Sequence, residues 1–167
     1  MKIKLLLLIL LSVIGVWSCL KGGSEGTVEA YDKIKVFAIE SSTCKSQEKK
    51  EYKWGNAPQR TTLRLKVKEG YVGGLFKNLT IPCDFERVYM LSQLHNGKDL
   101  VLILYPQKDK ADCLCPIDLR FTLGKLPYKK LHMKIFIADA ERRYRADLPY
   151  FAGDIILSEG NEMLINL

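Results

Sequence analysis

Residues 117–123 read Ile-Asp-Leu-Arg-Phe-Thr-Leu, and residues 131–137 read Leu-His-Met-Lys-Ile-Phe-Ile. Apolar side chains recur at every second position of both segments. This period of two places them on one face of a β-strand. The link between the segments, Gly124 to Lys130, is short, so we predict that the two strands form an antiparallel pair.

Similar strand patterns lie on both sides of this pair. Apolar positions alternate or cluster in residues 33–38, 61–67, 100–105, 152–157 and 163–167. With short turns between them, about eight strands predict an all-β fold with little helix: an antiparallel β-sandwich or barrel.

Two segments leave the secondary structure open. Pro82 to Leu94 suits either a short helix or one arm of a hairpin turning at Asn96-Gly97. We favour the hairpin, because Asn-Gly is a strong hairpin signal and the apolar run after it is typical of a central strand that needs a neighbour. Ala138 to Leu148 is rich in helix formers, and we interpret it as a helical turn or a long charged loop that ends at Pro149.

The N-terminus predicts export. Lys2 and Lys4 precede the uncharged apolar run Leu5 to Trp17, which is shorter than the roughly 20 residues of a membrane-spanning helix. Charge followed by an apolar run and a small residue is the order of a signal peptide, predicted here over residues 1–18. The alternative to a lipoprotein signal is an ordinary signal peptide, because Val16 and Ser18 also suit the general signal peptidase.

Cys19, directly after Ser18, resembles the lipobox cysteine of bacterial lipoproteins, although Trp17 departs from the usual small residue. The resemblance implies that Cys19 is acylated and becomes the first mature residue. Leu20, in place of a retention aspartate, implies the outer membrane. Residues 19–30 then form a flexible, glycine-rich tether, and residues 31–167 form a single β domain.

The segment Cys113-Leu114-Cys115-Pro116, leading into the strand at 117–123, resembles a stretch of small uncharacterised bacterial lipoproteins. That likeness implies a disulfide-linked β domain and no particular activity.

Without Lys2 and Lys4 the formal net charge of the chain falls from +7 to +5. This mild excess favours contact with anionic surfaces but is weak support for nucleic acid, which we do not expect as a partner.

Four cysteines follow Cys19: Cys44, Cys83, Cys113 and Cys115. In an oxidising compartment an even number predicts two disulfides. Cys113 and Cys115 are too close in sequence to bond each other, so each should reach one of Cys44 and Cys83, in either order. The alternative is a four-thiolate zinc site, but one C-x-C and two single cysteines differ from the usual ligand spacing. We therefore predict no metal and no other cofactor.

Catalytic signatures are absent from the sequence: it holds no G-x-S-x-G, H-E-x-x-H or phosphate-loop pattern. His95 and His132 are expected on the surface. Asp118 and Glu141 could serve as the paired carboxylates of a glycan-acting envelope enzyme, but nothing distinguishes them from other acids.

The densest basic segment combines arginine with aromatic residues: Arg142, Arg143, Tyr144, Arg145, Tyr150 and Phe151. This composition is typical of an interaction surface for a protein or an anionic sugar. The alternative is a charged loop whose aromatic residues close one end of the sandwich. The sequence thus favours a lipid-anchored, non-enzymatic binding protein of the envelope over the glycan-acting enzyme; a small inhibitor or assembly subunit is a third hypothesis.

Overall fold

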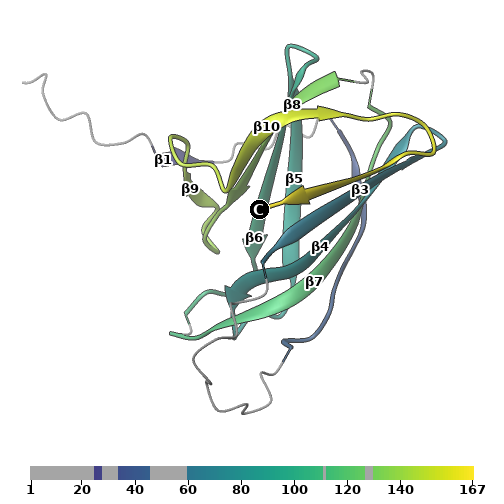
Figure 1. Ribbon diagram of the computed structural model, residues 1–167. Coiled ribbons are helices and arrows are strands. Elements are labelled where there is room, and N and C mark those ends of the chain that lie inside the picture. The colour runs from purple at the N-terminus through teal and green to yellow at the C-terminus, as the bar shows by residue number, and fades with distance from the viewer. Residues whose placement is uncertain (1–24, 28–33, 46–59, 111, 127–129) are drawn as a thin grey trace, which may run out of the picture.

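The computed structural model describes residues 25–27, 34–45, 60–110, 112–126 and 130–167. Within these ranges the chain forms eleven strands in three sheets and no helix (Figure 1). The all-β prediction is therefore confirmed. The strands are β1 (Glu25–Thr27), β2 (Val36–Ser41), β3 (Thr62–Lys68), β4 (Tyr71–Pro82), β5 (Val88–His95), β6 (Asp99–Pro106), β7 (Leu114–Leu123), β8 (Lys130–Ile137), β9 (Arg143–Arg145), β10 (Phe151–Ile156) and β11 (Glu162–Asn166).

The predicted signal peptide (residues 1–18), the candidate acylation site Cys19 and most of the predicted tether lie outside the described ranges. In the part of the chain that is described, no helix is long and apolar enough to cross a membrane.

Two large sheets pack as a β-sandwich. One has five strands in the order β11-β3-β4-β7-β2, and the other has four in the order β10-β8-β6-β5. A small third sheet pairs β1 with β9. Every strand pairing is antiparallel except that of β6 with β8, which run parallel. The antiparallel prediction thus holds for all but one pair.

The alternating sequence pattern produces the core directly. In β7, the side chains of Ile117, Leu119 and Phe121 are buried, whereas Asp118 and Arg120 face outward. Strands β3 and β8 bury their apolar positions in the same way, and one continuous core cluster contains residues of both large sheets. Full burial of such a side chain stabilises the fold by roughly 1.5–3 kcal/mol.

The predicted pairing of the two clearest strands is wrong. Strand β7 belongs to the five-stranded sheet, and β8 belongs to the four-stranded sheet, beside β6 and β10. Both edges of β7 are already occupied, by β4 and β2, so no edge remains for β8. The chain therefore crosses from one sheet to the other after Leu123.

The predicted hairpin is confirmed. Strands β5 and β6 pair along their whole length, and Asn96 and Gly97 in the turn have φ angles of 49° and 69°. Asparagine and glycine tolerate this left-handed backbone better than other residues do. Strand β6 is central as predicted, because it lies between β5 and β8. Ile103, on the outer face of β6, is as deeply buried as Leu102 and Leu104, which face the core.

Residues 138–148 form neither a helix nor a simple loop. Their middle part is strand β9, which pairs with β1, so three residues assigned to the flexible tether lie in a small sheet instead. Backbone pairing of this kind does not depend on an alternating side-chain pattern, and the sequence therefore carries little sign of it.

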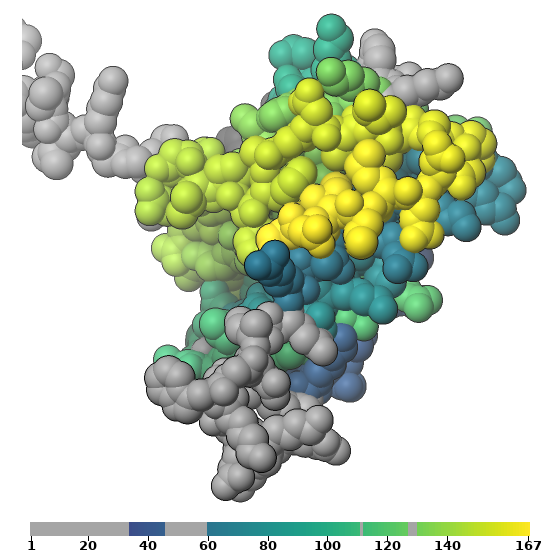
Figure 2. Space-filling model, in the orientation of Figure 1, coloured from purple at the N-terminus to yellow at the C-terminus, as the bar shows by residue number. Residues whose placement is uncertain are grey.

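The two closing strands form as predicted but lie in different sheets. Strand β10 pairs with β8 and β11 pairs with β3, and together they make a continuous surface on one face of the molecule (Figure 2). The carboxylate of Glu159, in the turn between them, accepts hydrogen bonds from the backbone N–H groups of Glu69 and Gly70. This contact ties the β10–β11 turn to the β3–β4 turn.

Candidate functional site

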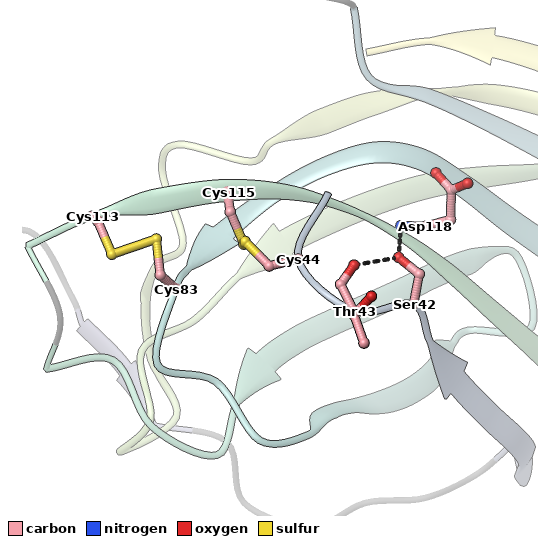
Figure 3. Close-up of a disulfide and its surroundings, with 7 residues drawn as sticks. All are labelled: Ser42, Thr43, Cys44, Cys83, Cys113, Cys115 and Asp118. Atoms are coloured by element: carbon pink, nitrogen blue, oxygen red, sulfur yellow. Dashed lines mark hydrogen bonds between the residues drawn. A yellow bond between two sulfur atoms is a disulfide. The ribbon is translucent and has the colours of Figure 1, made fainter. Parts of the chain in front are cut away.

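Four cysteines meet where strand β7 begins (Figure 3). Cys44 is bonded to Cys115, with 5.7 Å between their Cα atoms, and Cys83 is bonded to Cys113, with 5.5 Å. Cys83 follows β4 and Cys44 follows β2, so the two bridges join β7 to both of its neighbours. Each cysteine of the C-x-C pair is thus bonded to one upstream cysteine, and the order left open by the sequence is resolved.

The sulfur atoms of Cys44, Cys83 and Cys115 lie within 4.8 Å of one another. Such proximity would suit a thiophilic metal, but bonded sulfur atoms are not the thiolates that zinc binds. The arrangement is that of two adjacent structural bridges, which fits an oxidising, exported location.

Asp118, one of the two carboxylates considered for catalysis, lies close to these bridges on the outer face of β7 (Figure 3). Its Oδ1 accepts hydrogen bonds from Lys45 Nζ at 2.6 Å and from the backbone N–H of Asn78 at 3.1 Å. Burial alone would raise the pKa of Asp118, but these hydrogen bonds and the charges of Lys45 and Lys77 outweigh it and lower the pKa. Asp118 is therefore ionised at neutral pH and unsuited to act as a general acid.

Glu141, the other carboxylate, is ion-paired with Arg143 at 3.0 Å. It lies in the turn between β8 and β9, whereas Asp118 belongs to the five-stranded sheet, so the two do not share an element or a hydrogen-bond network. The histidines also have ordinary partners: His132 contacts Asp154 at 2.9 Å, and the exposed His95 contacts Gln93 at 3.0 Å.

Two arginines of the predicted binding segment are held by neighbouring acids. Arg143 Nε lies 2.8 Å from Asp139 Oδ2, and Arg145 pairs with Asp147 at 2.8 Å. Burial would raise the pKa of Asp139, but the backbone N–H and guanidinium of Arg143 lower it, and the hydrogen bond from Arg145 lowers the pKa of Asp147. The segment is thus less cationic than its sequence indicates.

The aromatic residues of this segment point in different directions. Tyr144 packs against Phe136 on the outer face of the four-stranded sheet, with 4.7 Å between ring centroids. Phe151 packs against the main core, whereas Tyr150 is 39% exposed. The six predicted residues therefore lie in one region but do not form one continuous patch.

Arg142 differs from its neighbours. Its φ angle is 67°, and its guanidinium lies over the ring of Tyr105, 5.1 Å from the centroid. Tyr105 in turn stacks on Tyr89, its register partner across the β5–β6 hairpin, at 5.4 Å. Arg142, Tyr105 and Tyr89 form a column, which we call the arginine–tyrosine column, on the outer face of the four-stranded sheet.

Tyr89 and Tyr105 were not predicted as site residues from the sequence. The predicted hairpin could have indicated the pair, because the register of its two strands places these tyrosines opposite each other. Arg142, the third residue of the column, is distant from both tyrosines in the sequence, so the sequence gives no sign of this contact.

No protein-family model, curated protein or solved structure matches the chain.

Proposed function

We propose that the protein is a lipid-anchored, exported β-sandwich with a non-enzymatic binding role at the bacterial outer membrane. Its proposed partner is an envelope protein or a glycan, and not a nucleic acid. The resemblance of Cys19 to a lipobox cysteine supports the anchor, and the two disulfides support export. The observation that carries the binding role is the arginine–tyrosine column, in which the guanidinium of Arg142 lies over the ring of Tyr105 and Tyr105 stacks on the exposed Tyr89.

A left-handed backbone costs a residue other than glycine roughly 1–2 kcal/mol. Arg142 adopts it at φ 67°, in a turn where the N–H of Arg142 donates to the carbonyl of Asp139. The cation–π contact with Tyr105 stabilises the fold by about 0.5–1 kcal/mol at an exposed site, which does not offset that cost. The turn accounts for this backbone, because the N–H of Asp139 also donates to the carbonyl of Arg143 and the last residue of such a three-residue hairpin loop is normally left-handed.

The chemistry of the column suits a binding surface. Arginine and tyrosine are enriched among the residues that dominate interface energetics. The guanidinium of Arg142 forms no ion pair within the described residues, and Tyr89 is 37% exposed. A partner with an anionic or planar group could contact both.

The lowered pKa of Asp118 counts against this residue as the acid of a glycan-acting enzyme. A general acid at neutral pH needs a raised pKa. Asp118, Asp139, Asp147 and Asp154 all have a lowered pKa. The third hypothesis, a small inhibitor or assembly subunit, is itself a binding role and shares the test below.

Replacing Arg142 with glycine tests the proposal. Because glycine accepts the left-handed backbone, Arg142→Gly should leave the melting temperature unchanged or raise it. The same replacement should abolish recovery of the envelope components that the wild type retains, as measured by quantitative mass spectrometry of crosslinked membranes. Arg145→Ser is the matched control, because it removes an exposed arginine of the same segment whose charge Asp147 already neutralises.

Unchanged recovery with Arg142→Gly would remove the column from consideration. A clear drop in melting temperature would show that Arg142 is structural. Equal loss with Arg145→Ser would point to the net charge of the segment and not to the column.

A further inference from the structure

Strand β4 contains two adjacent glycines, and core packing explains only one of them. Gly74 faces the core, where an added Cβ would lie 2.0 Å from Cζ of Phe121, so only glycine fits. Gly73 faces outward, and a Cβ there would meet nothing closer than the Lys66 carbonyl oxygen at 3.7 Å. That distance is an ordinary van der Waals contact.

Backbone geometry does not explain Gly73 either. Its φ angle is not positive, and it pairs in regular register with Lys66 on β3 and Thr122 on β7. Glycine inside a strand is roughly 0.5–1 kcal/mol less stable than alanine. Where no bulge or bend requires it, such a glycine often marks a place that a ligand approaches closely.

An open groove of about 360 Å³ lies over Gly73 on the outer face of the five-stranded sheet. Its cationic side chains come from the two strands that flank β4: Arg64 and Lys66 from β3, and Arg120 from β7. Lys66 is the register partner of Gly73, and Arg120 pairs with Leu75, two residues farther along β4. With neighbouring strands about 4.8 Å apart, the backbones that carry Lys66 and Arg120 therefore lie about 12 Å apart on a diagonal across β4.

Two of these cations are available to a ligand. Arg64 pairs with Glu162 at 3.1 Å, whereas Lys66 and Arg120 form no ion pair or hydrogen bond through their side chains to any described residue. The groove also contains Glu40, the register partner of Arg120 on β2, and the hydroxyl of Thr122. It therefore offers cations for an anionic group together with acceptors for hydroxyl groups.

Exposed aromatic rings lie beside the groove on the same outer face of the five-stranded sheet. Tyr71 lies two residues before Gly73, so it points to the same side of β4, and it is 40% exposed. Its ring makes an edge contact with Phe37 at 6.1 Å and lies 5.6 Å from Lys125 Nζ. An aromatic ring beside a polar groove can stack against the apolar face of a sugar.

We propose that the groove over Gly73 binds an acidic glycan. A sugar carboxylate lies between Lys66 and Arg120, sugar hydroxyls donate to Glu40 and Thr122, and a neighbouring sugar ring lies against Tyr71. An acidic peptide is disfavoured, because it has few hydroxyl groups to donate to Glu40 and Thr122. The site lies on the opposite sheet from the arginine–tyrosine column, so it goes beyond the proposed function and stands or falls separately.

The test uses short oligomers of a uronic acid, such as alginate, with the purified full-length chain in isothermal calorimetry. Gly73→Val fills the floor of the groove with a residue that strands favour, so its melting temperature should equal or exceed that of the wild type. Its affinity for the oligomer should fall at least tenfold. Thr80→Val is the matched control, because Thr80 is exposed on the same strand but does not line the groove, and it should bind like the wild type.

Lys66→Ser and Arg120→Ser should each weaken binding about tenfold and reduce its salt dependence, which keeps the test decisive if Gly73→Val folds poorly. Neutral dextran of the same length should not bind. No binding of the uronic acid oligomer, equal affinity for dextran, tighter binding of poly-glutamate, or unchanged affinity in Gly73→Val and both cation variants would each overturn the proposal.

Discussion

Replacing Cys83 and Cys113 together with alanine should lower the free energy of unfolding by about 3.6 kcal/mol, and replacing Cys44 and Cys115 should lower it by about 4.4 kcal/mol. These values follow from the loop entropy that each bridge removes from the unfolded chain, because the bonded cysteines are 30 and 71 residues apart. The longer loop should therefore give the larger loss.

The location of the bridges supports a large effect. Strand β7 lies between β4 and β2 in the five-stranded sheet, and the bridges hold its first residues to both neighbours. Cys115 is also 5% exposed, so its replacement removes buried contacts as well. Urea unfolding of each double variant, with and without reductant, measures the loss.

Reductant should destabilise the wild type more than either double variant. Alkylation of the unreduced, denatured wild type should find no free thiol at these four positions. A loss below about 1 kcal/mol in both variants, or four free thiols, would contradict the disulfide account.

The second large effect is expected at Gly74. Overpacking a well-filled core typically costs about 1–3 kcal/mol, and Gly74→Ala should reach the upper end, because its new methyl group would overlap the Phe121 ring. The outward-facing Gly73→Ala should be neutral or stabilising by up to about 1 kcal/mol. Chemical denaturation of the two variants compares the same substitution at adjacent positions.

A double-mutant cycle identifies the cause. Phe121→Leu removes the ring edge that the methyl group meets, so it should cost less in the Gly74→Ala background than in the wild type. If the two substitutions are additive, or if Gly73→Ala is as destabilising as Gly74→Ala, the assignment of the two faces of β4 is incorrect.

Local patterns in the sequence predict local structure well here. Alternation in residues 61–67, 117–123 and 131–137 identifies β3, β7 and β8 and their buried faces, and Asn96-Gly97 identifies the β5–β6 hairpin. Alternation determines which side of a strand is buried but not which strand lies beside it. The pairing of β7 with β8 was wrong for this reason: neighbours are decided by which sheet edges remain free.

The candidate sites show the same limit. Composition pointed to the segment that contains Arg142, but it could not show that Asp139 and Asp147 hold Arg143 and Arg145 or that Tyr89 and Tyr105 complete a column. The sequence does not distinguish Gly73 from Gly74. Only the position of the Phe121 ring shows that an added side chain would clash at Gly74 and not at Gly73. Contacts between segments distant in the sequence carry this information.

The most direct test of the central claim, a lipid-anchored envelope protein, is acylation at Cys19. One acyl chain gives marginal membrane binding, whereas two or more give a stable anchor. Cells expressing the wild type or Cys19→Ala are grown with a clickable fatty acid, and the label on each purified protein is measured. The account predicts a labelled wild type in the membrane fraction and an unlabelled Cys19→Ala variant. Equal labelling of both proteins, or of neither, would contradict it.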